Sequence, residues 1–311
     1  MKRSAAIITA LVLCLCVRGQ HYLDLQAGCG VGSLGYELTG GRTSPSLSYV
    51  FGAGYTWFML PSVGVQMGVQ VSRTATMSSL TEPMKWTEDA DGRRLKDYMG
   101  EEYTHCTNIS RWHERQELWM LQIPLGFRFR QYPPVSRQNA AFSRFGVILA
   151  GGVMAGIPLR SRYRLQEGHV THTGWYEQWR LLLHDVPGRF EEEEFASQEG
   201  TFSRYLKPFS LSVYGEAGML VRLSERVEAA IMAYITYMPV DLLSVPLNER
   251  SALGFASEQN GYTFMNTYDG IIGTDKTGSV RPWSVGLKAQ LTLFPGKTEK
   301  EKRRCMCAEM R

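Results

Sequence analysis

Two features are missing from this sequence of 311 residues: long apolar runs beyond its first 20 residues, and cysteine pairs with a recognisable spacing. A membrane-spanning helix needs ~18 or more consecutive apolar residues, so a helical membrane bundle is excluded. The composition, with 44% hydrophobic and 21% charged residues, excludes a disordered chain and a collagen. The length suits one large domain or two ordinary ones.

The cysteines do not predict a disulfide framework or a metal site. Of the six, two lie within the first 20 residues, and the other four are scattered: Cys29, Cys106, Cys305 and Cys307. No CxxC pair or zinc-ligand spacing occurs among them. The histidines fall mainly in predicted loops, where no regular element fixes their spacing. We therefore predict no metal and no cofactor.

Charge of one sign is also lacking. The formal net charge is +4, but Lys2, Arg3 and Arg18 belong to the N-terminal segment. Without them, 31 of the 34 basic residues remain, against 30 acidic residues. The remaining chain is close to neutral. Nucleic acid is therefore not a predicted partner.

The first 20 residues have the pattern of a secretory signal peptide. Two basic residues precede an apolar core over 5–17, which is too short for a membrane anchor. A lipoprotein is the alternative, because Gly28-Cys29 resembles the end of a lipobox, but polar residues interrupt the approach to Cys29. We predict a signal peptide over 1–20, a folded body over 21–296 and a flexible basic periplasmic tail over 297–311.

What the body does contain is strict alternation of apolar and polar residues. In one segment Leu23, Leu25 and Ala27 alternate with Asp24 and Gln26. A β-strand with two chemically different faces produces this pattern, and a helix does not. The pattern predicts eight strands, over residues 21–32, 46–57, 63–72, 118–130, 144–157, 209–223, 227–238 and 282–294.

The connections between these strands alternate between long and short, at about 13, 5, 46, 12, 51, 3 and 44 residues. Outer-membrane barrels have this asymmetry, with short periplasmic turns and long extracellular loops. A soluble barrel or sandwich is the alternative, but its polar face would be rich in Lys and Glu rather than in Gly, Ser, Thr and Gln. We predict an all-β fold: an eight-stranded antiparallel transmembrane β-barrel in the outer membrane, with both termini periplasmic.

The fourth predicted strand carries a family resemblance. The segment WMLQIPLGFRFR, with Pro124 inside the strand, resembles the YLEIPLLLKY strand of the PorT-like outer-membrane β-barrel family of the Bacteroidetes. GGVMAGIPL, which follows, is similar to the same family. The resemblance covers residues 21–296 in pattern, while the extracellular loops depart from it by their length. It implies a fold and a location; some members serve secretion machinery, and no catalytic residue carries over.

Charged residues recur on the predicted inner face. They are Asp24, Arg128, Arg130, Glu216, Arg222, Glu228 and Lys288. Because buried charges persist when they are paired, we predict a plug of ion pairs and hydrogen bonds, with a gated ion or proton path as the alternative. The three-residue loop 224–226 predicts that Arg222 faces Glu228 and that Glu216 faces Tyr234.

The long loops contain aromatic residues interleaved with charge. Trp86, Trp112, Trp175, Tyr176 and Trp179 form the predicted extracellular recognition surface, and packing of the loops on each other is the alternative. The extended character of 103–118 predicts that strands three and four protrude as a ribbon, with a hairpin turn at Asp91-Gly92.

These features predict a non-enzymatic barrel that presents large loops for recognition, adhesion or assembly with a surface or secretion complex. The predicted partners are outer-membrane lipid, including lipopolysaccharide, and envelope or secretion-complex proteins. A lipid A-modifying enzyme is the first alternative, with His172 or His113 acting beside Glu177 or Ser110. A narrow gated channel is the second.

Overall fold

The computed structural model describes residues 20–87, 94–97, 99–133, 144–186, 190, 192–195, 198–244, 253–256, 265–268 and 270–294. The predicted signal peptide, the basic tail and the Asp91-Gly92 turn lie outside the described residues. The strands are β1 (Gln20–Ser33), β2 (Gly41–Phe58), β3 (Val63–Leu80), β4 (Met84–Trp86), β5 (Thr104–Gln131), β6 (Phe145–Tyr176), β7 (Leu181–Leu183), β8 (Glu192–Phe195), β9 (Glu199–Gly200), β10 (Ser210–Arg222), β11 (Val227–Tyr237), β12 (Leu253–Ala256), β13 (Met265–Tyr268) and β14 (Trp283–Leu293). Two short 3₁₀ helices, η3 (Glu177–Trp179) and η4 (Ser203–Tyr205), complete the described elements.

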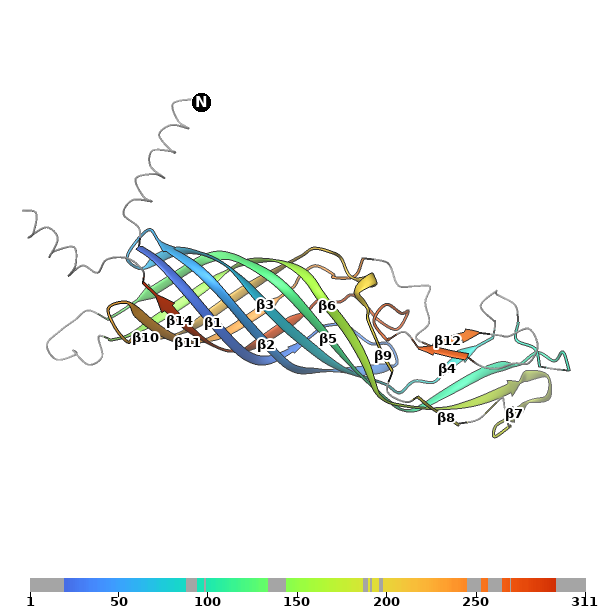
Figure 1. The fold of residues 1–311 in the computed structure, drawn as a ribbon. Coiled ribbons are helices and arrows are strands. Elements are labelled where there is room, and N and C mark those ends of the chain that lie inside the picture. The colour runs from blue at the N-terminus through green and yellow to red at the C-terminus, as the bar shows by residue number, and fades with distance from the viewer. Residues whose placement is uncertain are drawn as a thin grey trace, which may run out of the picture.

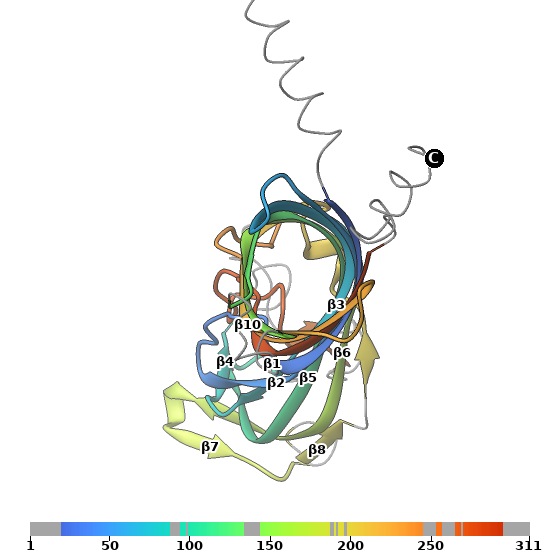
Figure 2. The ribbon, with the colours of Figure 1, turned by 90° about the vertical axis from the view of Figure 1, so that its left-hand side faces the viewer.

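Eight long strands close into one ring. The hydrogen-bonded order is β5-β3-β2-β1-β14-β11-β10-β6, and pairing of β5 with β6 closes it. All these neighbours are antiparallel, so the chain runs up and down around the ring (Figures 1 and 2). Each of the eight segments predicted from alternation belongs to one of these strands. The fold is therefore the predicted eight-stranded antiparallel transmembrane β-barrel.

The ring has two unlike ends. β1 begins and β14 ends at one of them, which we call the terminal end, together with the short link between β10 and β11. At the other, the extension end, β5 and β6 continue well past the ring (Figure 1). Among the described residues no helix is long and apolar enough to cross a membrane.

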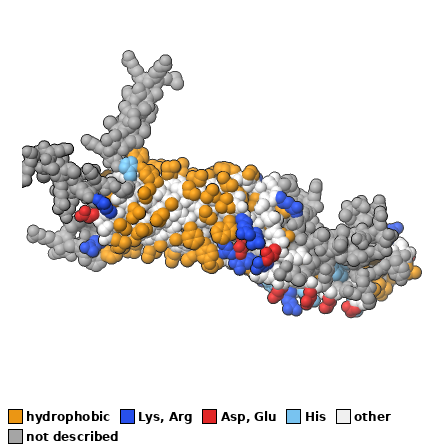
Figure 3. All heavy atoms as spheres, viewed as in Figure 1, with side chains coloured by type: hydrophobic (Ala, Val, Ile, Leu, Met, Phe, Trp, Pro, Cys, Tyr) orange, Lys and Arg blue, Asp and Glu red, His pale blue; other side chains and the backbone are white. Residues whose placement is uncertain are grey.

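The outer wall of the barrel carries a continuous apolar band. Its exposed side chains include Leu25, Phe51, Leu125, Leu149 and Ile231, which belong to five different strands. Figure 3 shows this band covering the barrel and ending before the extension. An exposed hydrocarbon surface of this extent is stable in contact with lipid and not with water.

A protruding ribbon is present as predicted, but β5 and β6 form it, whereas the sequence predicts β3 and β5. β3 pairs with β5 only as far as Ser79 opposite His113. The pairing of β5 with β6 closes the ring and continues past that point, up to Thr104 opposite Trp175. The short strands β4 and β8 flank this two-stranded core. β6 is 32 residues long, about twice the predicted segment, because it continues through 158–176.

Candidate functional site

The bore of the barrel contains a buried ion pair between β1 and β5. The carboxylate of Asp24, which is 2% exposed, lies 2.7 Å from Nη1 of Arg128 on the opposite side of the ring. Asp24 also accepts hydrogen bonds from Thr56, Gln290 and Thr292 at 2.7–2.9 Å. A buried carboxylate with four donors is electrostatically satisfied, so this group closes the bore rather than offering a free binding site.

A second group lies nearer the terminal end. Arg130 donates to Glu228 at 3.2 Å, to Tyr22 Oη at 2.6 Å and to Gln20 Oε1 at 2.9 Å. Its guanidinium also stacks 4.0 Å from the centre of the Phe58 ring. These contacts join Arg130 of β5 to β1, β2 and β11, so one arginine connects four strands across the bore.

Arg222 occupies its predicted register but is not the main partner of Glu228. The two residues are opposite each other on β10 and β11. The Nε of Arg222 lies 3.7 Å from Glu228, while its side chain is 48% exposed at the rim and covers the ring of Tyr132. Arg130 approaches more closely and from inside the bore, where water screens the attraction less.

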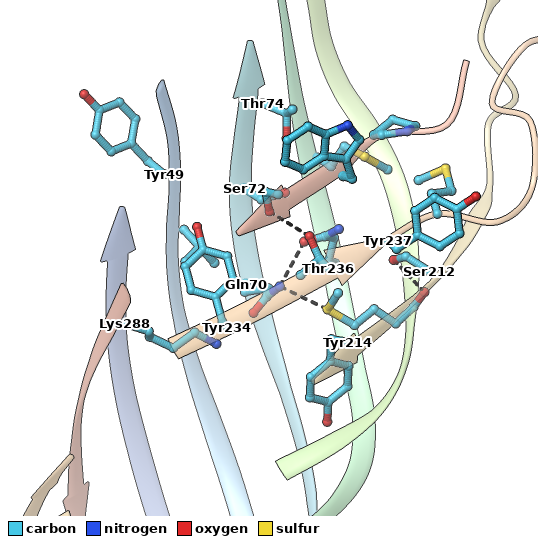
Figure 4. A pocket seen from close by; sticks show the side chains of 18 of the residues that line it. Tyr49, Gln70, Ser72, Thr74, Ser212, Tyr214, Tyr234, Thr236, Tyr237 and Lys288 are labelled. Atoms are coloured by element: carbon cyan, nitrogen blue, oxygen red, sulfur yellow. Dashed lines mark hydrogen bonds between the residues drawn. The ribbon is translucent and has the colours of Figure 1, made fainter. Parts of the chain in front are cut away.

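The third group is an ion pair between Lys288 and Glu216, on β14 and β10. Lys288 also donates to Gln26 at 3.2 Å. The predicted facing of Glu216 and Tyr234 is present in the register, but the charge of Glu216 is matched by Lys288 instead. Figure 4 shows Lys288 and Tyr234 beside a cavity that is also lined by Gln70, Tyr214 and Ser212.

The described cavities of the bore are small. Their volumes are about 30, 20 and 10 Å³. One water molecule needs ~10–15 Å³ of such space, so each cavity holds at most a few waters. Inward glycines allow this filling: a Cβ at Gly126 would lie 2.4 Å from the hydroxyl of Tyr214.

An apolar core covers the extension end of the bore. Leu34, Ile271 and Val280, from the connections between strands, are fully buried there against Leu165 of β6. Trp112, predicted to lie on a recognition surface, is 1% exposed within this core, so that part of the prediction is wrong. The inward face of β5 and β6 above the ring is mainly apolar, with the polar residues Glu114 and Gln116 buried among its apolar ones. The connections pack onto it, and the backbone N–H of Ile271 donates to Glu114.

A second apolar cluster stabilises the far part of the extension. Tyr103, Tyr176 and Phe190 pack there, with Leu95 beneath them, and the rings of Tyr103 and Tyr176 stack at 5.6 Å. Tyr176 is 2% exposed, so it also does not belong to the predicted recognition surface. Trp86 lies on β4 opposite His105, and its side chain is outside the described part.

Exposed apolar side chains do gather at the tip of the extension. Trp179 is 53% exposed and stacks on Tyr176, and Trp175 is exposed directly opposite Leu182 in the β6–β7 hairpin. Leu181 is exposed beside them. We call Trp175, Trp179, Leu181 and Leu182 the tip patch. It stands beyond the membrane-facing band, so lipid tails do not cover it.

Two histidines meet inside the extension. Nε2 of His105 lies 3.0 Å from Nδ1 of His172, and Thr107 Oγ1 lies 2.9 Å from the same Nδ1. Burial, with a smaller effect from the charge of His172, lowers the pKa of His105 to about 3. His105 is therefore neutral at physiological pH.

The histidines considered as catalytic residues, His172 and His113, do not contact Glu177 or Ser110 among the described interactions. His172 contacts His105 and Thr107, His113 Nδ1 lies 3.6 Å from Glu167, and Ser110 donates to the backbone of His169. In the part of the chain that the structure describes, no three His, Cys, Asp or Glu residues are arranged to hold a metal ion.

Of the comparisons with known proteins, the one with solved structures finds similar proteins. No family model and no curated protein matches the sequence. The chain is similar to Neisserial surface protein A (8% identity over 88% of this chain and 96% of that one, TM-score 0.34) and to the outer membrane protein OprG from Pseudomonas aeruginosa (12%, 87% and 95%, 0.32). It is also similar to Ail, the attachment invasion locus protein of Yersinia pestis, in complex with the heparin analogue sucrose octasulfate (11%, 87% and 99%, 0.27).

These similar structures are outer-membrane β-barrel proteins. At these identities and TM-scores the likeness carries no argument about this chain. The assignment of this chain as an outer-membrane barrel rests on the closed ring of strands and its apolar outer band.

Two features of the site have no counterpart in the sequence-based predictions. One is the capping core, whose members come from seven stretches of the chain: 34–36, 80, 109–120, 163–170, 202–206, 238–243 and 271–280. The other is a set of arginines on the outer wall of β6, at 160, 162 and 164. Arginines and uncharged residues still alternate over 160–165, but the outward positions there are even-numbered instead of odd-numbered. This shifted alternation is the sequence signal that could have identified the arginines.

Proposed function

We propose that this chain is a non-enzymatic outer-membrane barrel whose extension presents the tip patch to a protein partner at the cell surface. In this proposal both termini are periplasmic and the extension projects outward. The chain would act by recognition, adhesion or assembly with an envelope or secretion complex. The strand motif around Pro124 supports a relation to the PorT-like barrels, some of which serve secretion machinery.

The observation that carries the proposal is the exposure of the tip patch on a firmly built support. Trp175, Trp179, Leu181 and Leu182 are exposed, while the layer directly beneath them, Tyr176 included, is buried. Aromatic side chains held in place by packing lose little conformational freedom when a partner binds, and they dominate the energetics of many interfaces. A patch of this kind, outside the membrane band, suits a protein surface.

The closed bore supports recognition over conduction. Three sets of paired charges cross it, and an apolar core covers its extension end. Eight strands give a bore that side chains just fill, in agreement with the small cavities. The separation of the residues considered for an enzyme supports binding over catalysis.

Purification from native outer membrane after mild cross-linking tests this proposal. The wild type is compared with the tip variant Trp179→Ser/Leu182→Ser and with Leu60→Ser, which removes an exposed leucine at the terminal end. We expect the same partner protein with wild type and Leu60→Ser and its loss with the tip variant. Heat-modifiable migration checks that all three fold. An identical set of proteins with all three variants, or none with any, would contradict the proposal.

A further inference from the structure

A compact group of charged side chains lies on the outer wall at the extension end. We call it the rim cluster: Arg73 on β3, Arg115 and Glu117 on β5, Arg160, Arg162 and Arg164 on β6, and Glu199 on β9. Strand pairing brings these residues together, because Glu117 is opposite Arg162, Arg115 is opposite Arg164, and Arg164 is opposite Glu199. Figure 3 shows basic and acidic side chains gathered where the hydrophobic band ends.

The boundary between apolar and charged residues falls within one outward position on three adjacent strands. On β3, Val71 is followed on the outer face by Arg73. On β5, Trp119 is followed by Glu117 toward the extension, and Trp119 is paired with Arg160 of β6. A lipid molecule standing against this wall would place its acyl chains on the apolar side of the boundary and its headgroup on the arginines.

A β-bulge creates this boundary on β6. The pairing shifts between Trp119–Arg160 and Met120–Pro158, so Leu159 is the extra residue. As a result Leu159 and Arg160 are consecutive in sequence and both exposed on the outer wall. Bulges commonly re-aim side chains at barrel rims. Here the bulge places an apolar contact and a cation side by side.

The cluster carries more positive charge than its own acids neutralise. Glu117 pairs with Arg73 at 2.5 Å and with Arg115 at 3.0 Å, and Glu199 pairs with Arg162 and Arg164. Arg160 takes part in none of these ion pairs among the described residues. Five arginines against two glutamates leave a formal excess of three positive charges. Arg162 and Arg164 remain about half exposed despite their ion pairs.

We propose that the rim cluster binds the phosphate groups of a membrane glycolipid headgroup, of the lipid A type. Guanidinium groups recognise phosphate through charge-assisted, two-pronged hydrogen bonds. The apolar band directly below selects an amphiphile over a free anion, because it contacts the acyl chains while the arginines hold the head. Only the choice of the outer leaflet rests on the proposed outward orientation of the extension.

Lipid retention by the purified full-length barrel in neutral detergent tests the proposal, with native mass spectrometry as the readout. The rim variant Arg160→Gln/Arg162→Gln is compared with Arg42→Gln/Arg281→Gln, which removes two exposed arginines at the same end of the barrel, one on β2 and one just before β14. The probes are lipid A with its phosphates, the same lipid after enzymatic dephosphorylation, phosphatidylglycerol and inorganic phosphate. Heat-modifiable migration confirms that each variant folds.

We expect lipid A to bind the rim variant about tenfold more weakly than wild type, and the control within about twofold of it. Dephosphorylated lipid A should bind wild type as weakly as lipid A binds the rim variant. Equal binding of lipid A to wild type and rim variant would overturn the site. Displacement of the lipid by inorganic phosphate at the same phosphate concentration would overturn the lipid as the ligand. A preference for phosphatidylglycerol over lipid A would support the phosphate site and contradict the proposed orientation.

Discussion

At the scale of single residues, Glu228 has two arginine partners, of which Arg130 is buried and Arg222 is exposed. Breaking a well-buried pair costs ~3–5 kcal/mol, whereas an exposed pair contributes ~0–1 kcal/mol. We therefore expect Arg130→Ala to destabilise the barrel by about 3 kcal/mol and Arg222→Ala by about 1 kcal/mol or less. Urea unfolding in detergent, with double-mutant cycles to Glu228→Ala, should give the larger coupling energy for Arg130. Equal coupling for both arginines would contradict this reading of the bore.

Asp24 offers a second test at this scale, because one carboxylate serves four donors from other strands. Asp24→Asn preserves the shape but leaves Arg128 buried without a counter-charge, so we expect a loss of ~3–5 kcal/mol in unfolding free energy. Thr56→Val removes only one of the four hydrogen bonds and should cost ~1 kcal/mol. A cost for Asp24→Asn no larger than that for Thr56→Val would show that water reaches this group.

The sequence predicts the facing of Arg222 and Glu228 because a three-residue hairpin fixes the register of its two strands. The backbone bonds from Leu223 and Ser224 to Val227 close that hairpin as expected. The nearer partner of Glu228 was not predictable in this way, because Arg130 is 98 residues away in sequence and reaches it across the bore. Local rules give neighbours along a sheet, and contacts through a lumen depend on the closed ring.

At the scale of elements, the alternation predicted eight strands but ended β6 too early. The bulge at Leu159 shifts the outward positions from odd to even numbers, so a single period-two pattern stops at Ile157. Beyond the bulge the alternation resumes with Ser161, Tyr163 and Leu165 inward. The predicted recognition surface is partly wrong because two of its residues are buried. Trp112 lies on the buried face of the extended ribbon, and Tyr176 lies on the part of β6 beyond Ile157, which the alternation does not include.

The β5–β6 extension should respond to acid. The pKa of His105 is lowered to about 3 in the folded chain, from an ordinary value near 6.5, so the unfolded state binds the proton more readily between these values. The stabilising effect of the neutral histidine is complete above pH 6.5 and is lost as pH falls from 6.5 toward 3, by ~1.4 kcal/mol per pH unit. Amide hydrogen exchange should show faster opening of 104–113 and 167–176 at pH 5 than at pH 7. His105→Phe should remove this pH dependence, and an unchanged profile in that variant would contradict the assignment.

At the scale of the whole molecule, the apolar band sets the position of the barrel in the bilayer. Leu149 is exposed near the middle of this band, whereas Leu182 is exposed at the tip of the extension. We expect Leu149→Arg to cost ~2–4 kcal/mol in a lipid bilayer, because the charge meets hydrocarbon, and Leu182→Arg to cost less than ~1 kcal/mol. Folding titrations in liposomes measure both. Equal costs would place the membrane elsewhere along the barrel.

Two independent barriers close the bore, and electrical recording separates them. The paired charges around Asp24 and Arg128 fill the bore toward the terminal end, and the apolar core around Leu34 and Ile271 covers the extension end. In planar bilayers we expect no steady porin-like current from the wild type. We also expect none from Asp24→Ala/Arg128→Ala, because removing this ion pair leaves the apolar cover in place. Current through this double variant alone would show that the charges, and not the cover, form the seal. A steady large conductance in the wild type would contradict a closed bore altogether.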